Sequence, residues 1–535
     1  MKILLVRPPI YSKTLEYPSG PRFGVPIGLL YLAAYMEGER HEVAIYDALV
    51  DFEWKDIQRD GDGDYHIGAT WPRIVEKVLE YQPDILGITN PFSDMADYTI
   101  RVATEVKAIR PDIVTVVGGP HATSCAERFF TKDNSVDFVV RGEGEITLAR
   151  LADAVAEGNG AKDLPGVSYK DGDRIHSNPP APFIGNLDDL PLPAYHLVPM
   201  ERYFQLVKDG YPSRFMFEYP GSEREVSIIT SRGCPFHCVF CGNHIHMGRR
   251  WRYHGVAYVV DHMDVLISQY GVRHFHLEDD NIALNIERFD CLLDAIRERG
   301  WDITWDTSNG IRLDGLTPDL LRKIKDSRCT YLEFGIDSGK QETLDHIVKK
   351  GVKLEDAESI VATCKRLAID VHALYVVGFP AETHGDIEET FRFAKHLLWR
   401  YDAIPHLCMA RPLPGTELHE ICEKGGYLTE PILPEMGSGL RGEVYPRVMI
   451  QTEEFTPRDL ERWVGRFNRD VVAIMMVKTL AWLVRHPETI PSIIRKFWYD
   501  RRRGLREALK RIFYGGLFFK SNLLDKDLRD RFGRL

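Results

Sequence analysis

The chain alternates short apolar runs with amphipathic stretches over most of its 535 residues. Short buried strands that alternate with helices are typical of a doubly wound parallel sheet. Such a sheet binds ligands at the carboxyl ends of its strands. The first 150 residues therefore predict an α/β domain with a ligand site at one sheet edge. Its strands are expected at residues 2–6, 42–46, 84–89, 113–117 and 138–140.

A second series of six apolar runs begins at residue 226. Six consecutive strand–helix units indicate a partial (β/α)6 barrel, whose chemistry sits on the loops after the strands. The strands are expected at residues 226–230, 274–277, 303–307, 331–336, 371–377 and 406–410. The predicted organisation is a sheet domain at 1–150, a connecting segment at 151–220, a barrel at 221–425 and a helical C-terminal region at 426–535.

Composition excludes several classes of protein. Hydrophobic residues make up 44% and charged residues 27%, which is typical of a soluble globular protein. The formal net charge of -11 argues against generic nucleic-acid binding, which needs a basic face. We find no signal peptide and no apolar stretch of about 20 residues, so we expect a cytoplasmic protein. Its nine cysteines are then not expected to form disulfides.

Positive charge is concentrated at the C-terminus. From Arg485 to Leu535 there are 14 Lys/Arg and 6 Asp/Glu, whereas the remaining residues carry a net charge of -19. Aromatic residues such as Trp498 lie among these basic ones. One interpretation is a tail that contacts a membrane surface peripherally. The other is a helical cap packed over the barrel, with a solvated basic face.

Three cysteines lie within eight residues, just after the first strand of the second series. Cys234, Cys238 and Cys241 are spaced as Cys-x3-Cys-x2-Cys. A loop can fold three thiolates around one face of an iron–sulfur cube, which leaves one iron open to another ligand. The alternative is a structural zinc site, in which His237 or His244 would supply the fourth ligand.

This motif resembles the cluster-binding motif of the radical S-adenosylmethionine enzymes, in which an aromatic residue, here Phe240, precedes the third cysteine. The resemblance implies a 4Fe-4S cluster held by Cys234, Cys238 and Cys241. It implies that S-adenosylmethionine binds the open iron and is cleaved to a 5'-deoxyadenosyl radical. It also implies an external electron donor such as flavodoxin or ferredoxin.

The later strand ends resemble the loops that bind S-adenosylmethionine in that family. The loop Glu278-Asp279-Asp280 takes the place of the family's Gly-Gly-Glu, and Asp337 stands where Glu is commoner. These departures leave open which acid meets the methionine amino group. The residues expected at this cofactor are Phe240, Glu278, Asp279, Asp280, Arg312, Asp337, Ser338 and Gly378.

The first 150 residues resemble the cobalamin-binding domain found ahead of such barrels. The resemblance rests on residues 25–29, 117–121 and 141–145. The Asp-x-His-x-x-Gly motif is absent, so we expect no histidine of this domain beneath cobalt. Cobalamin is then expected to be held by backbone and packing at the sheet edge. The residues expected there are Pro26, Gly28, Thr89, Gly118, Gly119, His121, Gly142, Glu143 and Gly144.

Together the resemblances imply methylation of an unactivated carbon or phosphorus centre, with a small-molecule, tetrapyrrole or lipid-like substrate. The alternative reaction is anaerobic oxidative cyclisation or carbon–carbon bond formation without methyl transfer. A non-enzymatic electron carrier or sensor is a third hypothesis, and it would release no 5'-deoxyadenosine. The sequence assigns no catalytic residue beyond the cofactor ligands.

Overall fold

The computed structural model describes residues 1–12, 15, 21–57, 59, 63–209, 211, 222–430, 448–489 and 491. The chain divides into two compact units. The first unit contains Met1–Ile311 and Arg411–Met449, and the second contains Arg312–Ala410 and the chain from Ile450 on.

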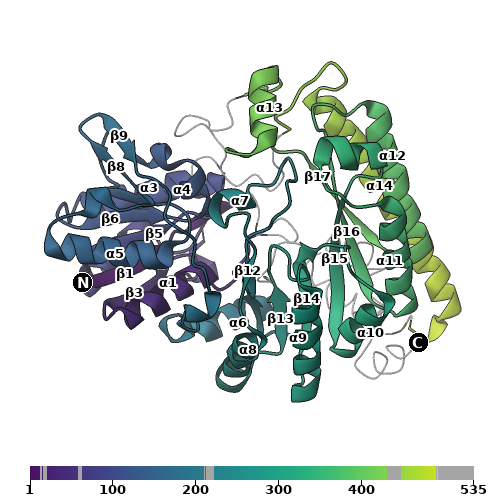
Figure 1. Ribbon diagram of the computed structural model, residues 1–535, viewed down its shortest axis with the longest axis horizontal. Helices are drawn as coiled ribbons and strands as arrows, with labels where there is room; N and C mark the ends of the chain where they lie inside the picture. The colour runs from purple at the N-terminus through teal and green to yellow at the C-terminus, as the bar shows by residue number, and fades with distance from the viewer. Residues whose placement is uncertain are drawn as a thin grey trace. The chain divides into compact units, whose positions relative to one another are not determined.

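A seven-stranded sheet forms the N-terminal part of the first unit, in the order β3-β1-β5-β6-β7-β8-β9 (Figure 1). The strands from β3 to β7 are parallel, and β8 and β9 add an antiparallel hairpin. The segment predicted to connect the domains therefore contributes two strands to this sheet. The strands are β1 (Lys2–Arg7), β3 (Glu42–Asp47), β5 (Ile85–Thr89), β6 (Val114–Gly118), β7 (Phe138–Val140), β8 (Val167–Asp171) and β9 (Arg174–Ser177).

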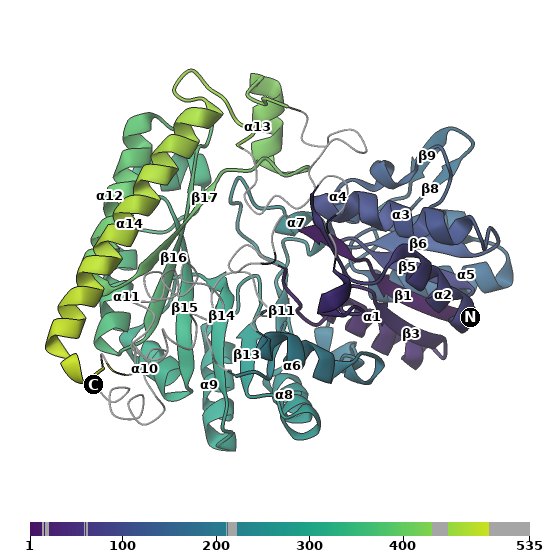
Figure 2. The ribbon, with the colours of Figure 1, turned by 180° about the vertical axis from the view of Figure 1, so that it is seen from behind.

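Helices cover both faces of this sheet (Figures 1 and 2). Ile3 and Leu5 of β1 belong to the core beneath α1 and α5, whereas Leu4 and Val6 belong to the core beneath α2 and α3. Successive side chains of a strand point to opposite faces, so a strand buried on both sides is a continuous apolar run. The helices are α1 (Ile27–Gly38), α2 (Trp71–Tyr81), α3 (Ala96–Lys107) and α5 (Gly144–Glu157), with shorter elements β2 (Ile10–Ser12), β4 (Tyr65–Ile67), α4 (Pro120–Ser124) and α6 (Met200–Lys208).

The first unit continues with three parallel strands that pair in chain order, β10, β13 and β14. A short antiparallel pair, β11 and β12, follows β10 and encloses the cysteine segment. The elements are β10 (Glu225–Ile228), β11 (Ser231–Arg232), α7 (Asn243–His246), β12 (Arg252–Tyr253), α8 (Val256–Tyr270), β13 (His274–Leu277), α9 (Ile286–Arg299), β14 (Thr304–Ile311) and α13 (Glu417–Gly425).

The second unit also contains three parallel strands that pair in chain order, β15, β16 and β17. The long helix α14 lies along α12 (Figure 2). No helix among the described residues is long and apolar enough to span a membrane. The elements are α10 (Pro318–Asp326), β15 (Cys329–Asp337), α11 (Leu354–Arg366), β16 (Asp370–Val377), α12 (His384–Tyr401), β17 (Ile404–Met409) and α14 (Pro457–Arg485).

The predicted fold class is confirmed. All six strands of the second series are present, each within a few residues of its predicted bounds, and they pair in chain order within each unit, as the strands of a (β/α) barrel do. Most of the basic, aromatic tail lies outside the described residues, so its contact with a membrane surface stays a prediction.

Candidate cofactor sites

The three cysteines lie in a loop whose two ends are paired with each other. Because β11 and β12 form an antiparallel pair, residues 233–251 form a loop whose two ends lie next to each other. None of the three cysteines is in a disulfide, and each is partly exposed. We call this segment, with the two short strands at its base, the cysteine loop (residues 231–253).

The three thiols are close enough to influence one another. Burial raises the pKa of Cys241 to about 11, and the neighbouring Cys238 and Cys234 contribute to this rise. A zinc ion bound at about 2.0–2.3 Å would gather its ligand atoms tightly. In the described part of the chain, no three ligand atoms among these thiols, His237 and His244 lie within 4.8 Å of one another. The donor set fits three corners of a 4Fe-4S cluster better than a zinc ion.

Gly233 allows the cysteine loop to fold back on its own base. Its φ is +85°, a conformation that favours glycine. A Cβ atom at this position would lie 2.5 Å from the backbone oxygen of Arg250. The Gly233 amide donates a hydrogen bond of 2.8 Å to the carboxylate of Asp280. The backbone of Gly233, next to Cys234, is therefore restricted both by the close approach of Arg250 and by the hydrogen bond to Asp280.

The acidic loop after β13 supports the cysteine loop. The Oδ1 atom of the buried Asp279 accepts hydrogen bonds from the Thr230 amide at 3.1 Å, from the Thr230 hydroxyl at 2.8 Å and from the Ser231 hydroxyl at 2.5 Å. Burial raises the pKa of both Asp279 and Asp280, although these hydrogen bonds oppose the rise. Two of the three acids of this loop thus contact the protein's own backbone. Glu278 is partly exposed, and its contact with the cofactor stays a prediction.

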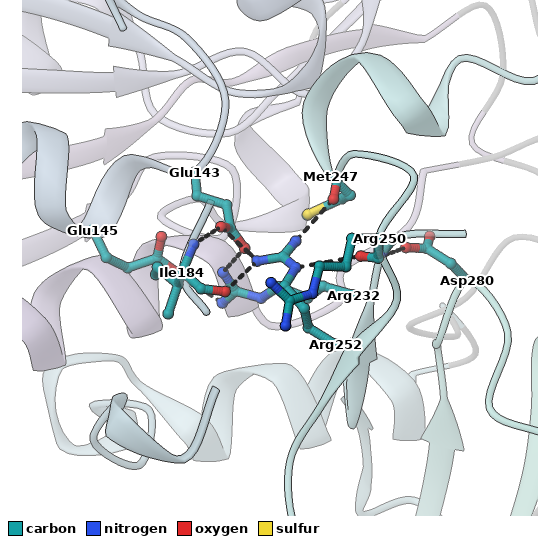
Figure 3. A network of polar contacts seen from close by, with 9 residues as sticks. Glu143, Glu145, Ile184, Arg232, Met247, Arg250, Arg252 and Asp280 are labelled. Carbon is teal, nitrogen blue, oxygen red and sulfur yellow. Dashed lines mark hydrogen bonds and ion pairs between the residues drawn. The ribbon is translucent and has the colours of Figure 1, made fainter. Parts of the chain in front are cut away.

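Glu143 was expected at cobalamin, but its carboxylate faces two arginines of the cysteine loop (Figure 3). Arg232 donates to Glu143 Oε1 at 2.9 Å and to Glu145 at 2.7 Å. Arg252 donates to both oxygens of Glu143, at 2.8 and 2.7 Å. The exposed fractions of these four side chains are 7% or less. We call Glu143, Glu145, Arg232 and Arg252 the arginine–glutamate network.

The other residues expected at cobalamin include five at adjacent strand ends. The Asn90 amide donates to the oxygen of Gly118 at 2.7 Å, which joins the ends of β5 and β6. The Gly142 amide donates to the Thr123 hydroxyl at 3.0 Å, which joins the end of β7 to α4, the helix that follows β6. A Cβ atom on Gly142 would meet nothing within 4 Å, so this backbone is open to a close approach. Of the nine predicted residues, these strand ends hold Thr89, Gly118, Gly119, His121 and Gly142.

His121 is buried behind the end of β6. Its Nδ1 lies 3.0 Å from the Ser93 hydroxyl, and its Nε2 has no hydrogen-bond partner among the described residues. Burial lowers the pKa of His121 to about 4, helped by Arg128 and Arg411. The imidazole is therefore neutral at pH 7.

The remaining predicted residues of the sheet domain lie at helix starts. Pro26 is buried before the first turn of α1, and Gly28 is exposed within that turn. A Cβ atom on Gly144 would lie 2.9 Å from Leu32 of α1. This glycine has a packing role, because it allows α5 to approach α1.

The second unit holds four residues expected at S-adenosylmethionine, and each of them has a polar partner within that unit. Asp337 is buried at a φ of +68° and pairs with Lys350 at 2.8 Å. Arg312 donates to the Lys350 oxygen at 2.9 Å. The Gly378 amide donates to the Glu382 carboxylate at 2.7 Å. The Ser338 hydroxyl lies 3.0 Å from that of Thr390.

Sequence reasoning missed a buried polar cluster between β13 and β14. His274 and His276 each lie 2.8 Å from the same oxygen of Asp306, and all three side chains are buried. Burial alone would lower the pKa of His276, but Asp306 and Glu225 raise it to about 10. These distances are those of hydrogen bonds. The alternation of His with apolar residues in β13 indicates a row of polar side chains that face the same way. The sequence contains no local signal that Asp306 of β14 is their partner.

Comparison with known families identifies both the N-terminal sheet domain and the region that contains the cysteine loop. The B12 binding domain family matches residues 21–152. The radical SAM superfamily matches residues 228–394. An uncharacterised methyltransferase, PH0819, of Pyrococcus horikoshii is 35% identical over 423 residues, which are 78% of this chain and 83% of that protein. The chain belongs to the cobalamin-dependent radical S-adenosylmethionine methyltransferase family.

Further relatives and a solved structure agree with this assignment. The cytidylyl-2-hydroxyethylphosphonate methyltransferase of Streptomyces wedmorensis is 28% identical, over 88% of this chain and 89% of that protein. The anaerobic magnesium-protoporphyrin IX monomethyl ester cyclase of Rubrivivax gelatinosus is 26% identical, over 85% and 77% respectively. The methyltransferase TsrM of Kitasatospora setae, solved with cobalamin and a [4Fe-4S] cluster, has the same fold, with a TM-score of 0.59 and 22% identity over 80% of this chain and 76% of that one.

Membership of this family confirms the three expected cofactors: a 4Fe-4S cluster, S-adenosylmethionine and cobalamin. As a radical S-adenosylmethionine enzyme the protein uses an electron donor. The hypothesis of an electron carrier or sensor is excluded by the same assignment.

Proposed function

We propose that this protein methylates a carbon or phosphorus centre of a small, phosphorylated or otherwise polar organic substrate. The observation that carries the proposal is that one compact unit contains both the cysteine loop and the strand ends of the B12-binding sheet. Similarity to a phosphonate methyltransferase over 88% of the chain supports a substrate of that size and polarity.

We assign the cluster to Cys234, Cys238 and Cys241. When bound, the cluster, S-adenosylmethionine and cobalamin supply a carbon-centred radical and a methyl group. The protein's own residues position these reactants. Asp279 and Asp280 fix the base of the cysteine loop through the hydrogen bonds to Thr230, Ser231 and Gly233.

We assign cobalamin to the ends of β5, β6 and β7. Buried polar atoms are normally hydrogen-bonded, yet Asn90 Oδ1 and His121 Nε2 have no partner among the described residues. These two polar atoms and the open backbone at Gly142 suit a ligand rich in amide groups, which both donate and accept hydrogen bonds. Burial keeps His121 neutral, and without the Asp-x-His-x-x-Gly motif we keep the prediction that it does not ligate cobalt.

We assign S-adenosylmethionine to the open iron of the cluster and to the strand-end loops predicted from the sequence. Glu278 is our candidate for the methionine amino group, because Asp279 and Asp280 contact the cysteine loop. Asp337 and Ser338 are the candidates for the ribose. A flavodoxin or ferredoxin is our candidate for the electron donor.

The test is product analysis with the full-length protein. Anaerobically reconstituted and reduced with dithionite, the wild type should form 5'-deoxyadenosine, and its substrate turnover should also yield S-adenosylhomocysteine. Replacement of Cys238 by Ala should lower 5'-deoxyadenosine formation by at least about 100-fold, because the cluster loses a ligand. Cys291→Ala is the matched control, since Cys291 is exposed and outside the loop.

Two outcomes would contradict this proposal. Equal 5'-deoxyadenosine from wild type and Cys238→Ala would remove the cluster assignment. Formation of 5'-deoxyadenosine during turnover without any S-adenosylhomocysteine would favour oxidative cyclisation, the activity named for the Rubrivivax gelatinosus relative.

A further inference from the structure

The arginine–glutamate network joins two parts of the first unit that are far apart in sequence. Glu143 and Glu145 follow β7 of the B12-binding sheet, whereas Arg232 and Arg252 belong to the cysteine loop. The Arg232–Glu143 pair spans 89 residues and the Arg252–Glu143 pair spans 109. Two carboxylates face two guanidinium groups, so the buried charges balance.

The two arginines hold both strands at the base of the cysteine loop. Arg232 and Arg252 are register partners in the β11–β12 pair. Arg232 lies two positions before Cys234. Arg252 also donates to the backbone oxygen of Met247 at 2.8 Å, within the loop itself. Any movement of Glu143 therefore reaches both ends of the segment that carries the thiols.

Glu143 is also held at its own end. One of its oxygens accepts from the Ile184 amide at 2.7 Å, and Arg252 donates to the Ile184 oxygen at 2.8 Å. It follows Gly142, whose φ is +80° and whose amide donates to the Thr123 hydroxyl of α4, the helix after the neighbouring strand β6. Glu143 thus connects the sheet edge to the cysteine loop through side chains that are almost fully buried (Figure 3).

We infer that Glu143 is a positioning residue that couples the cobalamin edge of the sheet to the iron–sulfur cluster. Through Arg232 and Arg252 it sets the conformation of the cysteine loop, and occupancy of the sheet edge changes the environment of the cluster. The inference rests on the proposed function, because it takes the cluster to lie in the cysteine loop and cobalamin at the ends of β5, β6 and β7. A residue that only bound cobalamin would affect cobalamin retention and leave the cluster unchanged.

The test uses Glu143→Gln in the full-length protein. Glutamine keeps the shape and an acceptor for the Ile184 amide, but it leaves two buried guanidinium groups facing one carboxylate. The readouts are iron per chain after anaerobic reconstitution, and the EPR spectrum of the reduced cluster with and without added hydroxocobalamin. We expect at least a twofold loss of iron and the loss of the change in the EPR spectrum that cobalamin causes in the wild type.

Glu201→Gln is the matched control. Glu201 also forms a two-bond pair with an arginine, Arg224, in the first unit, but this pair is more exposed and lies outside the cysteine loop. It should behave as the wild type in both readouts. Equal iron content and an equal response to cobalamin in Glu143→Gln and the wild type would overturn the inference, as would a wild-type spectrum that does not change with cobalamin.

Two further outcomes remain decisive. If Glu143→Gln does not fold, Glu145→Gln replaces it, because Glu145 contacts Arg232 alone in the network. Glu145→Gln should show a smaller loss in the same direction, and wild-type values in both readouts would then overturn the inference. A wild-type protein that binds no cluster would instead contradict the proposed function, so the two failures are distinguishable.

Discussion

The cysteine loop and the strand-end loops of the second unit are held in place differently. The bonds of the cysteine loop to Asp280, Asp279 and Glu143 span 47 to 109 residues. In the second unit, Gly378 bonds to Glu382 four residues away, whereas Arg312 bonds both to Asp314, two residues away, and to Lys350, 38 residues away. Ser338 also has a distant partner, Thr390, 52 residues away.

This difference separates two ways of building a site. A loop with distant partners adopts its conformation only when the rest of its unit has folded around it. A loop with near partners can form as soon as its own strand and helix are in place, because short loops cost less closure entropy. The cysteine loop should therefore respond to changes far along the chain more strongly than the loop at Gly378 does.

The largest expected effect comes from removing the carboxylate that supports the cysteine loop. Asp279→Ala leaves three donors on Thr230 and Ser231 without their acceptor. Since each buried unsatisfied group costs about 1–3 kcal/mol, we expect a loss of about 3–5 kcal/mol in the free energy of unfolding. Urea unfolding followed by circular dichroism measures this loss, and the iron content should fall with it.

Asp314→Ala provides the comparison in the second unit. Asp314 is 46% exposed and pairs with Arg312, so its loss should cost less than about 1 kcal/mol. An equal loss of stability in the two variants would show that distant and local partners do not differ as we propose.

A smaller effect is expected from adding one methyl group at a glycine in each region. Gly233→Ala would place a Cβ atom 2.5 Å from the backbone oxygen of Arg250 at a φ of +85°. Gly378→Ala would place one 2.4 Å from the side chain of Leu460 at a φ of +91°. Both substitutions incur about 1–3 kcal/mol of backbone strain. Backbone cannot move away as a leucine side chain can, so Gly233→Ala should have the lower melting temperature and should lose iron.

The smallest expected effect is a change in pH dependence within the second unit. Burial raises the pKa of Glu382 from its ordinary 4.5 to about 8, although the amides of Phe379 and Gly378 oppose the rise. The folded protein then binds this proton more tightly than the unfolded chain does. The stability contribution is present at low pH and is lost as the pH rises from 4.5 towards 8. Between pH 6 and pH 7 the loss is about 1 kcal/mol.

Glu382→Gln should remove this pH dependence, because glutamine can still accept from both backbone amides and does not ionise. Unfolding midpoints of the variant and the wild type, measured at pH 6 and pH 7, provide the test. A slope that persists in the variant would assign the titration to another group. Iron content should be unchanged, as expected for a loop held by local partners.

Much of the fold could be predicted because strands and helices follow local patterns. The strand at 274–277 has the bounds that its apolar run predicted. The cysteine motif could also be recognised, since three closely spaced thiols on one loop are a local signal. The roles of Asp279 and Glu143 could not, because each residue lies next to predicted cofactor residues in sequence while its partners lie far along the chain.

The sequence by itself determined the alternation of strands and helices, the Cys-x3-Cys-x2-Cys motif and the glycines at strand ends, because each depends on residues that are neighbours in the chain. Tertiary structure alone decided that Glu143 faces two arginines rather than a ligand, and that two acids after β13 support the cysteine loop. The physical reason is that a buried charge must be paired or hydrogen-bonded, and only the folded chain decides which opposite charge or donor lies next to it.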